Sequence, residues 1–144
     1  MIAALAVAFL AISYFLARWL TADNRERSYV TELLEYQAQG DPEGMLGLMA
    51  DCRPSATCRA RVRALARRFA GGDEVKIVRY DSGTARALGS AQAPTRVAWQ
   101  DGGPDSRVWV QCVQVTRSGV AFLGGQVRLD SIGAPIDGEA SCPA

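Results

Sequence analysis

The chain has 144 residues, of which 49% are hydrophobic and 22% are charged, and its formal net charge is +1. This length suits one domain, and this composition excludes an intrinsically disordered chain. The sequence contains no histidine, which excludes Ser-His catalytic triads and metal sites built on imidazole. All sixteen basic residues except Arg18 follow residue 22, where they balance fifteen acidic residues. That part of the chain therefore has no global attraction for nucleic acid.

The first segment of the chain is strongly apolar. Residues 1–17 read MIAALAVAFLAISYFLA. A helix rises about 1.5 Å per residue, so about twenty residues match the roughly 30 Å hydrocarbon core of a bilayer. We therefore expect residues 1–22 to form a transmembrane anchor, with residues 1–20 in lipid, and residues 23–27 to form a juxtamembrane linker. The alternatives are a buried core helix and a cleaved signal peptide, and the poor cleavage pattern at residues 20–22 disfavours the latter.

Two signals disagree about the side of the membrane on which the remaining chain lies. Arg18, Arg25 and Arg27 follow the apolar segment, and the positive-inside rule places such a flank in the cytoplasm. An even number of cysteines in a small domain instead favours disulfides and an oxidising compartment. We give the cysteines more weight and expect a single-pass protein of the cell membrane with an extracytoplasmic domain.

Three helices are expected after the linker. Residues 28–39 carry an apolar stripe at the i, i+3, i+4, i+7 spacing of one helix face, formed by Val30, Leu33, Leu34 and Gln37. Gly40 suits the end of this helix. The sequence DPE at 41–43 then supplies an N-cap, a proline at the first helical position and an acid near the positive end of the helix dipole. A third helix is expected over residues 58–69.

After the two glycines at 71–72, the hydrophobic pattern changes to that of β-strands. Strands are expected at residues 74–81, 84–88, 95–100, 107–117 and 120–132. Two glycines at 124–125 indicate a bulge or bend in the last of them. Helices followed by strands indicate an α+β fold. We expect about three helices, after the transmembrane helix, packed on one face of a bent antiparallel sheet of four to five strands.

The order of these elements resembles a known superfamily. A long helix ends in GDP at 40–42, and a short helix containing Met45, Leu46 and Leu48 follows before the antiparallel strands. This resembles the NTF2-like (cystatin-like α+β cone) superfamily, particularly its small membrane-anchored bacterial members of the actinobacterial type, which are uncharacterised. The resemblance covers residues 28 to about 132 and implies an NTF2-like extracytoplasmic domain over residues 28–144, with a pocket between sheet and helices.

The resemblance leaves the activity open, because the superfamily ranges from isomerases and dehydratases to scaffolds and secretion-system subunits. Catalytic members usually carry an Asp-His pair or an acid in the cone. This chain has no histidine, so the resemblance gives no catalytic residue here.

The four cysteines, Cys52, Cys58, Cys112 and Cys142, are expected to form two disulfides. Three pairings are possible, and the sequence alone does not choose among them. For an extracytoplasmic domain we favour Cys52–Cys58 with Cys112–Cys142. A zinc site is the functional alternative, but the sequence lacks both histidine and the short Cys-x₂-Cys spacing, and we expect no metal.

Arginines cluster in residues 53–68, with no acid among them. On the expected third helix, Arg59, Arg63 and Arg67 recur every four residues and therefore form one basic ridge. Such a ridge suits lipid headgroups, an acidic partner or a polyanion. A solvated helix face, balanced by acids elsewhere, is the simpler interpretation.

Four aromatic residues on the expected strands are candidates for lining a pocket: Tyr80, Trp99, Trp109 and Phe122. Trp99 and Trp109 flank the loop at 101–105 and are expected to face each other across it. Aromatic residues on strands are more often part of the core than of a pocket.

No pair of carboxylates is spaced for general acid–base catalysis, because Asp101 and Asp105 suit the turn in which they lie. We therefore expect no catalytic residue and no cofactor. The interpretation is a membrane-anchored, non-catalytic interaction or scaffold domain, an accessory of a membrane or envelope assembly, that binds a protein partner or a second copy and no nucleic acid. The first alternative is a lipid or small-ligand binding module, and the second is a hydrolase or isomerase using an Asp or Tyr in the cone.

Overall fold

The computed structural model describes residues 2–72, 74–85, 87, 89–102, 107–119 and 125–143. Its helices are α1 (Ile2–Gln39), α2 (Pro42–Leu48), the short 3₁₀ helix η1 (Ala50–Cys52) and α3 (Ala56–Phe69). Its strands are β1 (Lys76–Asp81), β2 (Ala91–Gln100), β3 (Trp109–Ser118) and β4 (Gln126–Ile132). The fold is therefore α+β, with the helices preceding the strands in the chain, as expected.

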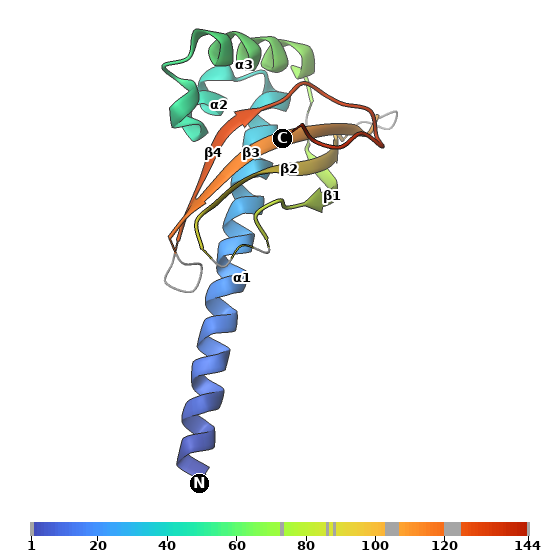
Figure 1. Ribbon diagram of the computed structural model, residues 1–144. Coiled ribbons are helices and arrows are strands. Elements are labelled where there is room, and N and C mark those ends of the chain that lie inside the picture. The colour runs from blue at the N-terminus through green and yellow to red at the C-terminus, as the bar shows by residue number, and fades with distance from the viewer. Residues whose placement is uncertain are drawn as a thin grey trace.

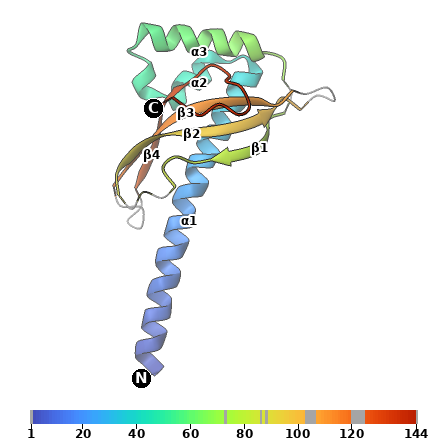
Figure 2. The same ribbon diagram turned by 45° about the vertical axis from the view of Figure 1, so that its right-hand side comes forward.

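The four strands form one antiparallel meander in the order β1-β2-β3-β4. Trp99 pairs directly with Trp109 across the β2–β3 hairpin, which confirms the expected juxtaposition of the two indoles. The pairing register shifts between Ile77 and Arg79 and again between Gln114 and Val115. Irregularities of this kind bend and twist a strand, and the sheet is accordingly curved (Figure 2).

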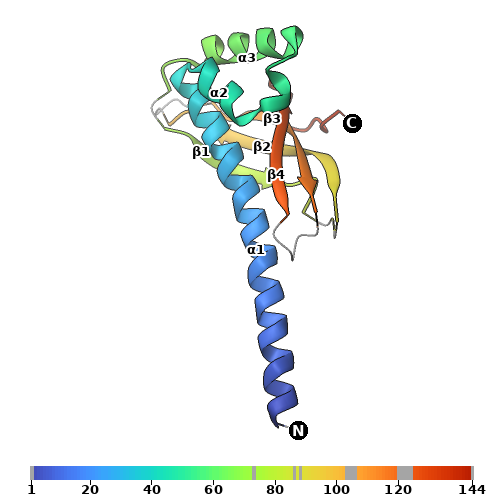
Figure 3. The same ribbon diagram turned by 90° about the vertical axis from the view of Figure 1, so that its left-hand side faces the viewer.

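The C-terminal half of α1 packs against one face of the sheet, and α2 and α3 cover the end farthest from the N-terminus (Figures 1 and 3). The stripe predicted for this part of α1 is fully buried: Val30, Leu33, Leu34 and Gln37 are each 0% exposed. The three apolar members, Val30, Leu33 and Leu34, pack in one core with Met45 of α2, Val62 of α3 and Trp99 of β2. The amphipathic pattern of the sequence therefore predicts correctly which face of this helix the sheet covers.

Helix α1 runs without interruption from the N-terminal arm into the domain, and Figure 1 shows the arm projecting away from the sheet. Residues 23–27, expected to form a juxtamembrane linker, are part of this helix. Residues 5–17 of the arm are exposed, and they include large apolar side chains such as Leu5, Phe9 and Leu10, which are 65–69% exposed. Within the described residues, no helix has both the length and the apolar content needed to cross a membrane.

The junction between α1 and α2 has the local chemistry expected of it. Gly40 has a φ of +72°, and a Cβ built there would lie 2.8 Å from the Cβ of Ala70, so glycine is required both for conformation and for space. Asp41 caps α2: its Oδ1 accepts hydrogen bonds from the backbone N–H groups of Glu43 and Gly44, each at 3.0 Å. The turn at this junction allows α2 to pack back onto α1.

Both disulfides of the favoured pairing are present, Cys52–Cys58 and Cys112–Cys142. The first joins η1 to the first turn of α3. The second attaches the C-terminal tail to β3, where the backbone N–H of Ile136 also donates to the carbonyl oxygen of Val110 at 2.8 Å. No thiolate is left for the alternative zinc site, because all four cysteines are oxidised.

The strand predictions are wrong in one place. Residues 84–88 were expected to form a strand, but Thr84, Ala85 and Ala87 lie in the connection between β1 and β2. The Thr84 hydroxyl donates a hydrogen bond to the carboxylate of Glu26 on α1. The described part of the sheet has four strands, and Gly124 of the expected bulge lies outside the described residues.

Candidate functional site

The most concentrated polar chemistry of the domain surrounds Glu26, at the point where α1 enters the domain. Glu26 is 0% exposed, and side chains from three strands and a loop donate to its carboxylate. The donors are Tyr80 Oη at 2.9 Å, Thr84 Oγ1 at 2.6 Å, Thr95 Oγ1 at 2.7 Å, and Arg117 Nε and Nη2 at 3.0 and 2.8 Å. We call Glu26 and these four donor residues the Glu26 cluster.

Glu26 stays ionised in this setting. Burial on its own raises the pKa of the carboxyl, but side-chain hydrogen bonds from Thr84, Thr95, Ser82 and Tyr80 more than offset this and hold the pKa below its ordinary value of 4.5. The guanidinium of Arg117, 5% exposed, supplies the opposite charge that a buried carboxylate requires.

The arrangement fixes Glu26 rather than presenting it to a substrate. Both carboxylate oxygens are occupied by donors from the protein, and Glu26 lines neither of the two hollows described below. A general acid or base needs contact with the group whose proton it transfers. The cluster is therefore a polar joint that attaches the base of α1 to β1, β2 and β3.

A second buried polar group lies between α1 and the sheet, in the space where the superfamily resemblance implies a pocket. Gln111 Oε1 accepts from Gln37 Nε2 at 3.0 Å and from Trp99 Nε1 at 2.8 Å, while Gln111 Nε2 donates to the carbonyl oxygen of Gly133 at 3.1 Å. Gln37, Trp99 and Gln111 are all fully buried. Their polar groups are bonded to one another and not aimed into a cavity.

Of the four aromatic residues proposed as pocket residues, the structure brings the two tryptophans together. Trp99 and Trp109 both pack on Phe69, with ring centroids 5.1 and 5.2 Å away. Tyr80 instead belongs to the Glu26 cluster, and Phe122 lies outside the described residues. Tyr80, Trp99 and Trp109 line neither of the hollows described below, and both tryptophans contact the core.

The basic ridge belongs to α3, which lies at the end of the domain opposite the arm (Figures 1 and 3). Arg63 and Arg67 are exposed, whereas Arg59 is half-buried and its guanidinium donates to the carbonyl oxygen of Arg53. Among the described residues, no ion pair involves an arginine of α3. This leaves a basic surface without a counter-charge of its own.

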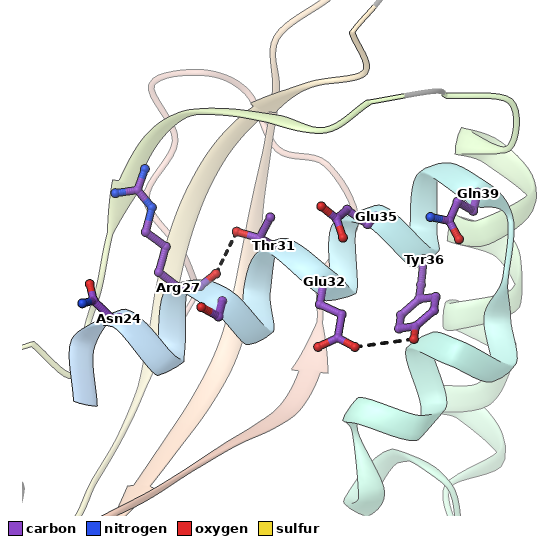
Figure 4. Close-up of a pocket in the computed structure, with 8 residues that line it drawn as sticks. Asn24, Arg27, Thr31, Glu32, Glu35, Tyr36 and Gln39 are labelled. Atoms are coloured by element: carbon purple, nitrogen blue, oxygen red, sulfur yellow. Dashed lines mark hydrogen bonds between the residues drawn. The ribbon is translucent and has the colours of Figure 1, made fainter. Parts of the chain in front are cut away.

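An open hollow of about 690 Å³ runs along the face of α1 that points away from the sheet (Figure 4). The hollow is lined by Asn24, Arg27, Ser28, Thr31, Glu32, Glu35, Tyr36 and Gln39. A smaller hollow lies beside the β3–β4 turn and is lined by Arg117, Ser118, Gly119, Gly125, Gln126 and Val127 with Ala87 and Gly89. Neither hollow was expected from the sequence, for which the implied pocket lay between the sheet and the helices.

The Glu26 cluster was also missed, although the sequence carries one signal for it. Glu26 lies at the same helical phase as Val30, Leu33 and Gln37, four, seven and eleven residues later. An acid in phase with a buried stripe predicts a buried acid with a partner. Nothing in the sequence indicates which distant residues supply that partner.

Comparison with known proteins adds no assignment to this geometry. No family model, no curated protein and no solved structure matches the chain.

Proposed function

We propose that the protein is a membrane-tethered, non-catalytic interaction domain of NTF2-like architecture, displayed on the extracytoplasmic face of the cell membrane. The observation that carries the proposal is the continuity of α1. One helix has an exposed apolar N-terminal half and a C-terminal half buried in the domain. Such a helix suits a fixed support more than a flexible tether.

The exposed arm supports a tether. Soluble monomers rarely expose large contiguous apolar surfaces, yet Leu5, Val7, Phe9, Leu10 and Ile12 are each at least 60% exposed. The sequence around them is apolar from residue 1 to residue 17. Inserting the arm into lipid removes this surface from water, which is favourable by roughly 25 cal/mol per Å² of apolar area.

The disulfides support the extracytoplasmic side. Disulfides persist in oxidising compartments and are rare in the cytosol, and here both pairs are formed and no cysteine is free. The arginines that follow the apolar segment argue for the opposite side, and we give them less weight because the domain's two cross-links are a property of its folded structure.

The basic face of α3 is the proposed contact for a partner protein. It lies at the end of the domain opposite the arm (Figure 1), so it faces away from the membrane that holds the arm. An acidic protein surface fits Arg63 and Arg67 better than the headgroups of that membrane, and a neutral domain offers no global field to bind a nucleic acid.

The two other functions are less well supported. A ligand-binding cone needs space on the concave side of the sheet, where Leu33, Met45 and Trp99 are packed with 0% exposure. An enzyme using an acid in the cone needs an accessible carboxylate, and the buried acid on that side, Glu26, is fully engaged with protein donors.

The anchor is tested by placing two charges in the arm. We expect the full-length variant Leu10→Arg/Ile12→Arg to leave the membrane fraction, because each charge at the centre of a span costs about 2.5–3.5 kcal/mol on insertion scales. The matched control is Val78→Arg, since Val78 is an apolar residue of the sheet that is 53% exposed. Retention of the double variant in alkali-washed membranes, at the level of the control, would contradict the anchor.

A further inference from the structure

The geometry points to a second copy of this chain as the occupant of the hollow on α1: two copies pack in parallel, α1 against α1, through the face that points away from the sheet. This inference concerns a surface that the proposed function does not use. It rests on three observations, which are the side chains at the centre of the face, their repeat, and the charges at its borders.

The centre of the face is formed by small or short polar side chains. Asn24, Ser28 and Thr31 follow one another at spacings of four and three residues, which is the spacing of a helix–helix seam. Short side chains let two helix backbones approach closely. The Thr31 hydroxyl already donates to the carbonyl oxygen of Arg27 at 2.8 Å, so covering Thr31 leaves no unsatisfied donor behind.

The same seam continues into the arm. Leu10, Ala17, Asn24 and Thr31 are separated by seven residues each, and a seven-residue repeat keeps one seam of a helix facing a parallel partner. The apolar side chains that bind the sheet, such as Val30 and Leu33, are on the other side of α1, and the sheet contact at the border is that of the Arg27 guanidinium with the Tyr80 ring, at 5.9 Å. A second helix can therefore pack along α1 without displacing the sheet.

Opposite charges lie on the two borders of the face. Figure 4 shows the Arg27 side chain on one border and the Glu32 side chain on the other. A two-fold axis parallel to the helices brings the Arg27 border of one copy against the Glu32 border of the other. The two residues are five apart, which is the offset of interhelical ion pairs in parallel, in-register coiled coils. An antiparallel pair would instead place like borders together.

This complementarity is what selects a second copy over another occupant. One chain carries both members of the ion pair at the offset that two-fold symmetry requires, so the same ion pair forms twice in the dimer. Glu35, the next residue along the centre of the face, meets its own symmetry mate and repels it. We therefore expect the two helices to be in contact as far as Thr31 and to diverge beyond it.

Disulfide trapping tests the face directly. In the full-length protein in detergent micelles, we expect Ser28→Cys to give a reducible covalent dimer on mild oxidation. Tyr29→Cys is the matched control, because Tyr29 is the neighbouring residue of the same helix, is 38% exposed and does not line the hollow. Equal trapping at both positions, or none at Ser28→Cys, overturns the inference.

Charge exchange tests the symmetry. We expect Arg27→Glu and Glu32→Arg each to raise the dissociation constant of the dimer by about threefold to tenfold, since each substitution breaks two exposed pairs and creates repulsion. The double variant Arg27→Glu/Glu32→Arg restores the opposite charges and returns the constant to within about twofold of the original protein. Circular dichroism of each variant shows whether the fold is retained.

The remaining outcomes also decide the matter. A protein that stays monomeric at every concentration, or a dimer indifferent to all three charge variants, overturns the inference. The inference is also overturned if the double variant associates with the original chain but not with a second copy of itself. These experiments measure dimerisation in detergent, whereas the Leu10→Arg/Ile12→Arg experiment measures retention in the membrane. A negative result in one therefore leaves the other proposal standing.

Discussion

Glu26 and Arg117 lie 91 residues apart in the sequence and form a buried ion pair at the base of the domain, with Arg117 Nη2 and Nε at 2.8 and 3.0 Å from one carboxylate oxygen of Glu26. The pair joins the helix that carries the arm to the third strand of the sheet. A force applied to the arm therefore reaches the sheet through a bonded contact as well as through the apolar core.

Removing one member of this pair should destabilise the domain strongly. We expect Arg117→Met to lower the free energy of unfolding by about 3–5 kcal/mol, because it leaves a charged carboxylate buried without its counter-ion. Denaturant titration measures the loss. The control is Arg128→Met, whose ion pair with Asp51 is 56% exposed on both sides and should contribute about 0–1 kcal/mol. Equal losses for the two variants would mean that Glu26 does not depend on Arg117.

The Glu26 cluster should also make stability depend on pH. The folded-state pKa of Glu26 lies below its ordinary value of 4.5, so the unfolded chain takes up this proton first as the pH falls. The contribution of Glu26 is therefore complete above about pH 4.5 and is lost as the pH falls through the lower, folded-state value. We expect Glu26→Gln to flatten this acid limb of the stability curve. An unchanged acid limb in that variant would assign the pH dependence to other carboxyls.

The buried amide of Gln111 should contribute to the free energy of unfolding without involving any charge. We expect Gln111→Leu to lower the free energy of unfolding by about 1–3 kcal/mol, since it leaves the Trp99 indole N–H and the Gln37 amide buried without their acceptor. The exposed Gln126 at the start of β4 provides the control, Gln126→Leu, which should change stability by no more than about 0.5 kcal/mol. Near-ultraviolet circular dichroism reports whether the environment of Trp99 has changed.

The two disulfides should differ in their effect on stability. They close loops with sequence separations of 6 and 30, and the chain-entropy relation gives about 2 and about 3.6 kcal/mol respectively. We therefore expect Cys112→Ala/Cys142→Ala to destabilise the domain more than Cys52→Ala/Cys58→Ala in equilibrium unfolding. The reverse order would show that the short cross-link between η1 and α3 is under less strain, or more integral to the core, than loop length alone implies.

The basic face of α3 yields a prediction about the partner. A photoreactive residue placed at Ala64, between Arg63 and Arg67, should cross-link an acidic protein in intact cells. We expect Arg63→Glu/Arg67→Glu to abolish that product through like-charge repulsion. The control exchanges two basic residues of the sheet edge, Lys76→Glu/Arg79→Glu, and should leave the product unchanged. Persistence of the product in the α3 variant would locate the contact elsewhere.

Local chemistry made several elements predictable. The sequence DPE at 41–43 predicts the start of α2 because each residue acts on the helix end beside it, and Asp41 indeed caps the helix. The phase of Val30, Leu33 and Leu34 predicts the buried face of α1 for the same reason. The pairing of Trp99 with Trp109 follows from their positions on either side of one hairpin connection.

Features that depend on distant partners were not predictable. The sequence did not predict that α1 continues through residues 23–27, nor that Glu26 is buried there because Thr84, Thr95 and Arg117 surround it. Thr84, in a loop, and Thr95, in β2, both donate to that same carboxylate, so the bond to Glu26 does not follow from the strand pattern. A helical phase identifies which side of a helix is buried but not which residues of a sheet meet it.

The continuity of α1 fixes the rotation of the domain relative to the N-terminal arm. An α-helix turns about 100° and rises about 1.5 Å per residue. Adding one residue to the arm would therefore rotate the α3 arginines by about 100° about the helix axis, relative to the start of the arm, and move them by only about 1.5 Å along it. A pair of added residues would turn them nearly to the far side. The number of residues in the arm thus sets the direction in which the α3 arginines face, relative to the start of the arm.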